Sequence, residues 1–457
     1  MNQETIAAIA TALGNAGISI IRISGENALN IALDIFINKS HNKVSEFKSR
    51  YLNYGSIVDK NNKVLDEVLL TYMKAPYTFT KEDVVEIHCH GGVISAKKIL
   101  DLVLTYDCRM ADNGEFTKRA FLNGRIDLTQ AEAVIDIINS KTDRNQEISV
   151  NQLEGRLSKQ INKLIEIIIE LLANIEVNID FPEYDEDNIT IERVKEKSNL
   201  MLNEINKLIE TADTGKIYKE GIKTLILGKP NVGKSSLMNF LLNENRAIVT
   251  EVPGTTRDTI EEYVNIKGVP LNIIDTAGIR KTEDTVEKIG VEKALSKIYE
   301  ADLIIMVLDA SKELEIEDKQ ILDYVKNKKV IYIKNKTDLE QKLNLDDYEN
   351  ISKNIINISV LNNKGLEDII KSIHDMFFKG KINIDNSIII NNARHKNLLV
   401  NASKNLKEVL KSIDNNMPID FIEIDLKSCM ENLGLIIGKA VSDDLVDKIF
   451  SDFCIGK

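Results

Sequence analysis

The spacing of apolar residues divides the chain into stretches of different predicted structure. Up to about residue 118, short apolar runs alternate with helical stretches, which is typical of an α+β domain. Strands are predicted at Thr5–Ala10, Ile18–Ile23, Glu67–Met73 and Val84–Cys89. From Glu132 to Thr211 the apolar positions recur at helical spacing, so this stretch is predicted to form long amphipathic helices.

Strands and helices alternate again in the middle of the chain, as a mostly parallel sheet requires. Helical spacing returns from His395 to the C-terminus, with a break predicted at Pro418. Because the ends of a domain often lie close together, one domain can be inserted into another. We therefore expect a multidomain α/β protein with an N-terminal α+β domain, a split all-α helical domain and an inserted domain with a mostly parallel sheet. The predicted ranges are 1–118, 119–218, 219–378 and 379–457.

Hydropathy and cysteine usage narrow the class of protein. No apolar stretch reaches the roughly 18 residues of a membrane helix, and the longest run, Leu164–Val177, contains glutamates and predicts a buried bundle helix. The N-terminus lacks a signal-peptide pattern, so we expect a cytoplasmic protein that does not bind membranes. The widely spaced cysteines match no zinc pattern and suit reduced thiols. They are Cys89, Cys108, Cys429 and Cys454.

The acidic balance limits the surfaces that the chain can offer to nucleic acid. The formal net charge is −12, which excludes a surface covered by basic patches. Any contact with nucleic acid is therefore expected to be local or shared with a partner.

One segment carries a specific chemical signal. Gly228–Ser235 fits the phosphate-binding pattern G-x-x-x-x-G-K-S, between a predicted strand, Ile222–Leu227, and a helical pattern from Ser236. Glycines let backbone N–H groups point at phosphate oxygens, and the helix N-terminus adds partial positive charge. Lys234 is predicted to reach the β- and γ-phosphates of a nucleotide, and the Ser235 hydroxyl to hold Mg²⁺.

Two further motifs match the metal and γ-phosphate side of such a site. Gly254–Asp258 reads Gly-Thr-Thr-Arg-Asp, and Thr256 is predicted to offer its hydroxyl to Mg²⁺. Asp275–Gly278 follows the predicted strand Leu271–Ile274; its aspartate is predicted to act on the water shell of the metal. The N–H of Gly278 is predicted to sense the γ-phosphate.

The last two motifs select the base. Asn335–Asp338 reads Asn-Lys-Thr-Asp after the predicted strand Val330–Ile333, and Ser359 is predicted to close over the base. A carboxylate at Asp338 accepts two hydrogen bonds from N1–H and the 2-amino group of guanine, which adenine lacks. The ordered set predicts a Ras-like GTPase domain. Its predicted GTP-binding residues are Asn231, Val232, Gly233, Lys234, Ser235, Ser236, Thr250, Glu251, Val252, Pro253, Gly254, Thr255, Thr256, Asp275, Thr276, Ala277, Gly278, Asn335, Lys336, Asp338 and Ser359.

The position after Gly278 is Ile279, where Ras-like proteins carry a water-orienting glutamine. Another group must therefore neutralise charge in the transition state. Arg280 is one alternative, as an arginine finger. We favour a monovalent cation held by the side-chain carbonyl of Asn231 and by backbone carbonyls of the loop Thr250–Thr256.

The chain resembles the tRNA modification GTPase family MnmE, also called TrmE, over essentially its full length. The segments that carry this resemblance are Thr5–Thr11, Ile20–Gly25, Phe79–Gly92, Gly114–Gly124 and the C-terminal Phe453–Lys457, besides the GTPase motifs. Two loops depart from the family pattern, at Ala12–Gly17 and at Asn113. The resemblance implies a homodimer and a potassium-stimulated GTPase. The implied potassium ligands are Asn231, Thr250, Val252 and Thr255, and Glu287 is the implied catalytic glutamate that orients water.

The resemblance also implies a 5-formyltetrahydrofolate or related tetrahydrofolate cofactor in the N-terminal domain. The matching positions are Arg22, Glu86, Arg125 and Lys457; a carboxylate suits the amino edge of a pterin and cations suit a glutamate tail. His88 and His90 share a strand face, but two histidines without a third ligand favour a hydrogen-bonded scaffold, so we predict no zinc.

The resemblance implies that Cys454 acts in the modification chemistry; the alternative from the residues alone is an idle thiol. It further implies a partner, the flavoprotein MnmG, which brings FAD in a heterotetramer or larger complex. Together they add an aminomethyl or carboxymethylaminomethyl group to C5 of the wobble uridine of certain tRNAs. Two rival hypotheses are a ribosome-assembly GTPase, which would need an RNA-binding appendage, and a folate enzyme with a regulatory GTPase domain.

Overall fold

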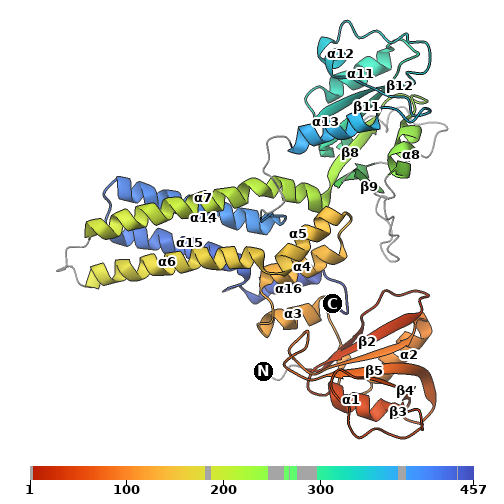
Figure 1. Ribbon diagram of the computed structural model, residues 1–457, viewed down its shortest axis with the longest axis vertical. Coiled ribbons are helices and arrows are strands. Elements are labelled where there is room, and N and C mark those ends of the chain that lie inside the picture. The colour runs from red at the N-terminus through yellow and green to blue at the C-terminus, as the bar shows by residue number, and fades with distance from the viewer. Residues whose placement is uncertain are drawn as a thin grey trace. The chain divides into compact units, whose positions relative to one another are not determined.

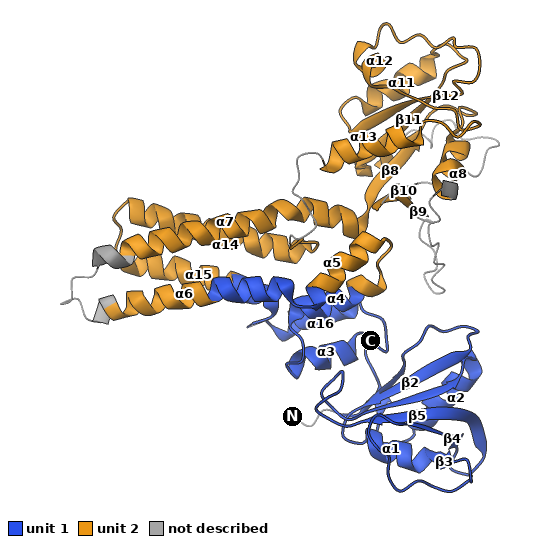
Figure 2. Cartoon of the chain, viewed as in Figure 1, with its two compact units in different colours: residues 1–135, 152–165, 433–457 blue, residues 136–151, 166–432 orange. Residues whose placement is uncertain are grey.

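The computed structural model describes residues 4–180, 187–244, 262–266, 268–274, 296–378, 388–439 and 441–457 (Figure 1). The chain separates into two compact units (Figure 2). Unit 1 comprises residues 1–135, 152–165 and 433–457, and unit 2 comprises residues 136–151 and 166–432.

Unit 1 is built on a seven-stranded sheet with the strand order β3-β4-β5-β6-β2-β1-β7. Its strands are β1 (Ile6–Ile9), β2 (Ile18–Ser24), β3 (Phe36–Asn38), β4 (Leu52–Val58), β5 (Val64–Met73), β6 (Val84–His90) and β7 (Arg109–Met110). All pairs are antiparallel except β1 with β7, which is parallel. The apolar side chains of one sheet face pack with α1 (Ala28–Ile35) and α2 (Val93–Val103) in a continuous core.

The remaining helices of unit 1 join distant parts of the chain. They are α3 (Glu115–Leu122), most of α4 (Leu128–Ile138), the start of α6 (Arg156–Asp180) and α16 (Asp443–Ser451). Phe450 and Phe453 at the end of the chain pack with Ala120 and Leu128 in a second apolar cluster. The C-terminal residues are therefore fixed to the same unit as the N-terminal sheet.

Long helices form the first part of unit 2. They are most of α5 (Asp143–Leu153), the rest of α6, α7 (Asp187–Glu220), α14 (Ala393–Asp414) and most of α15 (Ile419–Ile437). Helix α14 packs along α7, and Lys195 of α7 forms a 2.7 Å ion pair with Asp414 (Figure 1). This packing joins the helical stretches on both sides of the middle sheet, as expected for a split helical domain. Helix α15 begins directly after Pro418, where the break was predicted.

A six-stranded sheet forms the second part of unit 2, with the strand order β13-β12-β11-β8-β10-β9. Its strands are β8 (Ile222–Leu227), β9 (Glu262–Ile266), β10 (Val269–Ile274), β11 (Leu303–Asp309), β12 (Val330–Asn335) and β13 (Ile356–Asn357). All pairs are parallel except β9 with β10. The helices that accompany it are α8 (Lys234–Glu244), α11 (Ile316–Val325), α12 (Glu349–Asn354) and α13 (Leu366–Phe378). The predicted multidomain α/β architecture is confirmed.

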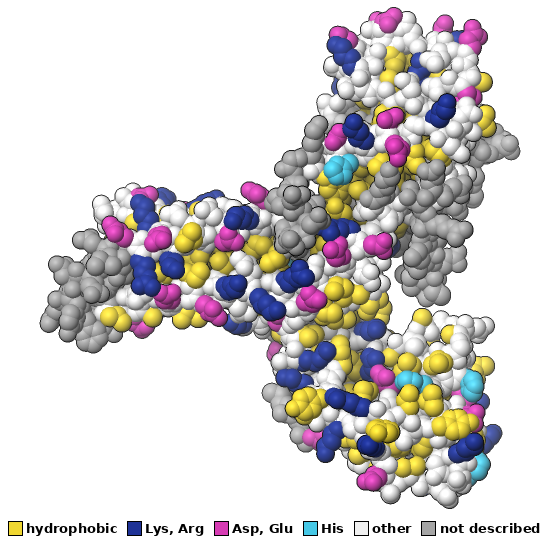
Figure 3. Space-filling view, in the orientation of Figure 1, with side chains coloured by type: hydrophobic (Ala, Val, Ile, Leu, Met, Phe, Trp, Pro, Cys, Tyr) yellow, Lys and Arg dark blue, Asp and Glu magenta, His cyan; other side chains and the backbone are white. Residues whose placement is uncertain are grey.

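The surface is mixed in charge. In the view of Figure 3, Lys and Arg side chains alternate with Asp and Glu over the long helices of unit 2. Among the described residues, no helix is both long and apolar enough to cross a membrane.

Candidate functional site

The segment between β8 and α8 is a tight loop in which three residues have a positive φ. The φ angles are +146° at Gly228, +65° at Asn231 and +100° at Gly233. A Cβ atom on Gly228 would lie 2.4 Å from the carbonyl oxygen of Val307, and one on Gly233 would lie 2.2 Å from Nδ2 of Asn335. Both positions therefore require glycine, because the loop backbone packs closely against β11 and the end of β12.

Lys234 is the first residue of α8, so its ammonium lies at the helix N-terminus. The Nζ atom donates to the carbonyl oxygens of Gly228 and Lys229, each at 2.7 Å, and burial lowers the pKa of Lys234. A phosphate oxygen is a stronger acceptor for an ammonium than a peptide carbonyl. Ser235 follows in the same turn and supplies a hydroxyl. Lys234, Ser235 and the α8 N-terminus therefore fit a phosphate chain with Mg²⁺.

The end of β12 is tied to this loop by two side chains. Asn335 Nδ2 donates to the carbonyl oxygen of Val232 at 2.9 Å, and Lys336 Nζ donates to that of Asn231 at 2.8 Å. Asp338 accepts a 2.6 Å hydrogen bond from the Ser359 hydroxyl through Oδ1. The structure thus brings the predicted phosphate-binding and base-binding motifs together at the carboxyl ends of the strands, where open parallel sheets bind ligands.

The other predicted nucleotide and cation residues lie outside the described residues. These are Thr250, Glu251, Val252, Pro253, Gly254, Thr255, Thr256, Asp275, Thr276, Ala277, Gly278, Ile279, Arg280 and Glu287. Strand β10 is described to its last residue, Ile274, which pairs with Leu225 of β8. The carboxyl end of β10 is therefore at the same sheet edge as the phosphate-binding loop.

A second group of predicted residues meets in unit 1. Arg22 of β2 and Glu86 of β6 are direct register partners, and Arg22 Nε donates to Glu86 Oε1 at 2.8 Å. Arg22 also donates through NH1 to the carbonyl oxygen of Gly456 at 3.2 Å, and its guanidinium lies 5.7 Å from the centre of the Phe116 ring. One arginine thus joins two sheet strands to the C-terminal residues.

The C-terminal residues are held by further backbone contacts. Ile455 forms an antiparallel bridge with Asn113, and the N–H of Gly114 donates to the carbonyl oxygen of Cys454 at 3.3 Å. A Cβ on Gly456 would lie 2.4 Å from the carbonyl oxygen of Ile9. The segment 453–457, called the C-terminal tail below, is therefore packed against the end of β1 and the start of α3.

The tail that carries Lys457 contacts the Arg22–Glu86 pair. Arg125 is elsewhere and stacks over Phe79, with its guanidinium carbon 4.6 Å from the centre of the ring. Phe79 packs against the cluster that contains Phe116 and against the cluster around Phe450, so Arg125 borders the same apolar region. A carboxylate, arginines and aromatic rings in one region fit a flat heterocycle with an anionic tail. The Arg22 guanidinium and the Glu86 carboxylate are already hydrogen-bonded to each other. A ligand that binds either group would therefore compete with this ion pair.

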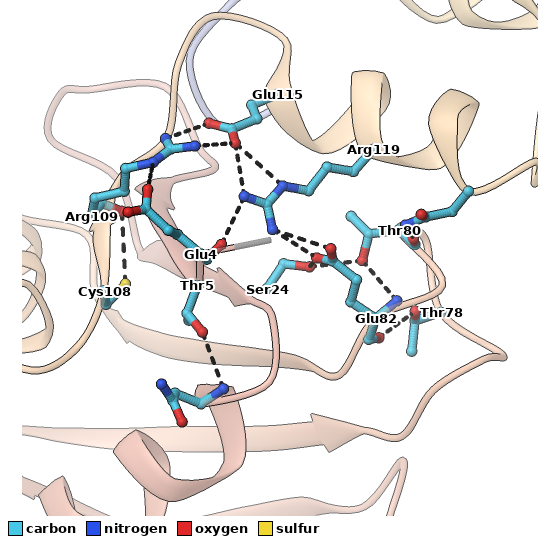
Figure 4. Close-up of polar contacts among 12 residues, drawn as sticks. Glu4, Thr5, Ser24, Thr78, Thr80, Glu82, Cys108, Arg109, Glu115 and Arg119 are labelled. Atoms are coloured by element: carbon cyan, nitrogen blue, oxygen red, sulfur yellow. Dashed lines mark hydrogen bonds and ion pairs between the residues drawn. The ribbon is translucent and has the colours of Figure 1, made fainter. Parts of the chain in front are cut away.

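Sequence analysis missed a polar network at the start of α3 (Figure 4). Arg119 is only 3% exposed; it donates to Glu115 Oε1 at 2.8 Å and to both oxygens of Glu82 at 3.1 Å. Arg109 donates to the two oxygens of Glu115 at 2.6 and 2.8 Å. Burial alone would raise the pKa of Glu115, but hydrogen bonds from Arg109, the Asp112 N–H and Arg119 lower it to about 2. The only sign of this network in the local sequence is that Glu115 and Arg119 are four residues apart on one helix.

The two histidines of β6 each lie beside a carboxylate. His88 Nε2 lies 3.5 Å from Glu86 Oε2, and His90 Nδ1 lies 2.7 Å from Asp66 Oδ1. The bond to Asp66 raises the pKa of His90. His90 is thus part of a hydrogen-bonded scaffold, as expected. In the part of the chain that the structure describes, no three His, Cys, Asp or Glu side chains are grouped to hold a metal ion.

All four cysteines are free thiols, but their environments differ. Burial raises the pKa of Cys89 and Cys108 to about 11 and that of Cys429 to about 12. Cys454 is the exposed one. A thiol with a raised pKa is a poor nucleophile at neutral pH, which argues against the other three cysteines. Cys454 is accessible from solvent.

Comparison with known proteins covers the whole chain. The family described as the GTP-binding protein TrmE N-terminus matches residues 5–125, and the MnmE helical domain matches residues 128–454. The tRNA modification GTPase MnmE of Clostridioides difficile is 54% identical over 457 residues, 100% of this chain and 99% of that protein. The chain belongs to the MnmE family.

Other MnmE relatives agree. The Alkaliphilus oremlandii and Bacillus licheniformis proteins, both named tRNA modification GTPase MnmE, are 53% and 49% identical, over 100% of this chain and at least 99% of theirs. Among solved structures, the G domain of the T. maritima FeoB iron transporter is 26% identical, covering 34% of this chain and 97% of that chain, with a TM-score of 0.24. Aquifex aeolicus Era is 27% identical, covering 40% and 66%, with a TM-score of 0.25.

Proposed function

We propose that the chain is a GTP hydrolase that takes part in tRNA modification. The observation that carries the first part is the junction of Asp338 and Ser359 with a phosphate-binding loop anchored by Asn335. In this junction the carboxylate proposed to read guanine and the lysine proposed to bind phosphate follow strands of the same sheet edge. Membership of the MnmE family along the full chain supports the second part and favours tRNA modification over the ribosome-assembly alternative.

Hydrolysis is proposed to use Mg²⁺ at Ser235 and Thr256, and K⁺ bound by Asn231 with Thr250, Val252 and Thr255. Support comes from Asn231, which has a left-handed backbone conformation. Lys336 Nζ donates to its carbonyl oxygen and so fixes this conformation. The cation supplies positive charge beside the phosphates, and Glu287 orients the water. Turnover in KCl should exceed turnover in NaCl at equal ionic strength; equal rates would contradict the cation site and favour Arg280.

The N-terminal domain is proposed to bind a tetrahydrofolate, such as 5-formyltetrahydrofolate, near Arg22, Glu86, Arg125 and Lys457. Support comes from the meeting of Arg22 and Glu86 with the tail. The bound folate would supply a one-carbon unit. The chain's own contribution is to fix the backbone of the exposed Cys454 through the Gly114 N–H, two residues before Gly456, whose carbonyl oxygen accepts from Arg22.

The proposed product is a tRNA with an aminomethyl or carboxymethylaminomethyl group at C5 of the wobble uridine. The proposed assembly is a cytoplasmic homodimer that works with MnmG, which would bring FAD. The net charge of −12 supports sharing of tRNA contacts with a partner.

Mass spectrometry of tRNA nucleosides tests the tRNA part of the proposal. Cells that lack the chain should lose the 5-substituted wobble uridine, wild type should restore it, and Cys454→Ser should not. An unchanged nucleoside profile on deletion would contradict the assignment to tRNA. Restoration by Cys454→Ser would retain the assignment but remove Cys454 from the chemistry.

A further inference from the structure

A buried aspartate outside the GTPase motifs contacts the site. Asp309 is the last residue of β11 and pairs in register with Asn335, the last residue of β12. Its side chain is 4% exposed. Oδ1 accepts hydrogen bonds from the Ser311 N–H at 3.0 Å and from its hydroxyl at 2.7 Å, and Oδ2 accepts one from Lys336 Nζ at 2.6 Å. The carboxylate is therefore fixed on one side and aimed at Lys336 on the other.

Lys336 lies at the centre of this arrangement. Its ammonium is shared between Asp309 Oδ2 and the carbonyl oxygen of Asn231 in the phosphate-binding loop. Burial alone would raise the pKa of Asp309, but the hydrogen bonds from Lys336 and Ser311 lower it, so the carboxylate stays charged opposite the ammonium. Asp309 thus sets where the positive charge of Lys336 lies.

The position of that charge matters because Lys336 is only two residues before Asp338. A carboxylate that pairs with an ammonium has fewer lone pairs and less charge to offer to another donor. If Lys336 turned toward Asp338, the ammonium would compete with the N1–H and 2-amino group of the base. A lysine held by Asp309 cannot compete in this way.

We propose that Asp309 is a positioning residue for guanine recognition. It holds Lys336 on the phosphate-binding loop, which fixes the Asn231 carbonyl and keeps Asp338 available to the base. This inference rests on the proposed binding of GTP. The two are distinguishable, because failure of wild type to bind guanine nucleotides would contradict the proposed function itself.

The chain offers a matched control at the other end of the loop. Lys229 Nζ lies 2.7 Å from Asp318 Oδ2 and 3.1 Å from Glu315 Oε2, both at the start of α11. Asp318 is 5% exposed, nearly the same as Asp309. Asp318→Asn therefore removes a similarly buried negative charge that lies at a similar distance from Lys229 of the phosphate-binding loop. It leaves Lys336 and its contacts unchanged.

The test compares GDP with IDP, which lacks the 2-amino group, as competitors of a fluorescent GDP analogue. Asp309→Asn should weaken GDP binding about tenfold, the loss expected for one charged hydrogen bond. It should also reduce the preference for GDP over IDP at least about threefold, because Asp338 then shares its acceptors with Lys336. Asp309→Glu should keep most of the preference, and Asp318→Asn should lower both affinities by the same factor. An unchanged preference in Asp309→Asn would overturn the proposal.

A second comparison tests the role of Asp309 even if the Asp309→Asn single variant does not fold. In the Lys336→Gln background the ammonium is absent, so Asp309 has no charge left to position. Adding Asp309→Asn there should cause no further loss of GDP affinity and no change in the GDP to IDP preference. A further loss of either would show that Asp309 acts by another route and would overturn the proposal.

Discussion

At Gly233 the phosphate-binding loop passes so close to Asn335 that a methyl group has no room. A Cβ there would lie 2.2 Å from Nδ2 of Asn335, the atom that donates to Val232. The clash would fall on the hydrogen bond that joins the two motifs. The sequence pattern requires Gly233 for binding of phosphate. The structure shows that Gly233 is also required for the contact between the phosphate-binding loop and the end of β12.

Gly233→Ala should therefore weaken nucleotide binding by at least about tenfold, because the loop must move away from β12 to accept the side chain. The φ of +100° adds backbone strain of about 1 kcal/mol or more. Titration of a fluorescent GDP analogue measures the affinity.

Gly268→Ala is the matched control. Gly268 has a φ of +89°, but a Cβ there meets no atom within 4 Å. This variant should show strain without loss of affinity. Equal affinities for Gly233→Ala and wild type would show that the loop tolerates the clash and would contradict the prediction.

Sequence alone identified the residues of the phosphate-binding loop, because their spacing is itself the signal. It did not identify the ion pairs that Asp309 and Lys229 form with residues distant in the sequence. Their partners lie 27 and 89 residues away in the chain, in Lys336 and Asp318. Such pairs become visible only when the sheet aligns the ends of its strands.

At the scale of elements, periodicity located the strands well. Strand β8 runs from Ile222 to Leu227 as predicted, and β2 exceeds its prediction by one residue, Ser24. Helix α8 begins at Lys234, two residues before the predicted start, because the phosphate-binding loop leads directly into its first turn. The short strands β3 and β7 gave no period-two pattern long enough to read. The seven-residue strand β4 was also not predicted.

Helix α3 depends on charges that no apolar pattern reveals, and this makes its stability depend on pH. The pKa of Glu115 is about 2 in the folded chain against 4.5 for an unperturbed glutamate. The folded state therefore binds this proton less tightly than the unfolded state. Its contribution, roughly 3 kcal/mol, should be complete above about pH 5 and should be lost as pH falls from 4.5 toward 2.

Hydrogen exchange of the α3 amides, corrected for intrinsic rates, measures this effect. Protection should fall between pH 5 and pH 3 in wild type, in the window set by the two pKa values. Glu115→Gln should show lower protection at neutral pH and little change over that window. Constant protection of wild-type α3 down to pH 3 would contradict the prediction.

At the scale of the whole molecule, the last residues complete a structure that begins with the first strand. The Arg22–Gly456 hydrogen bond joins residues 434 positions apart. The C-terminal signature could be recognised from sequence, but the sheet on which it rests could not, because no local pattern encodes a contact of that range. The residues proposed for GTP hydrolysis belong to unit 2, and the tail belongs to unit 1. Release of the tail should therefore reduce tRNA modification and leave GTP turnover nearly unchanged.

Gly456→Ala is expected to release the tail, because its Cβ would lie 2.4 Å from the Ile9 carbonyl oxygen and 3.0 Å from Ala10 Cα. Carboxypeptidase should then remove the last residues at least about tenfold faster. The 5-substituted wobble uridine should fall toward the level of Cys454→Ser, while GTP turnover stays within about twofold of wild type. Gly124→Ala, at a φ of +65° with open space around it, is the control and should retain both activities. Loss of GTP turnover in Gly456→Ala would mean that the tail acts on hydrolysis as well, and full modification by this variant would mean that its packing is not needed for the chemistry.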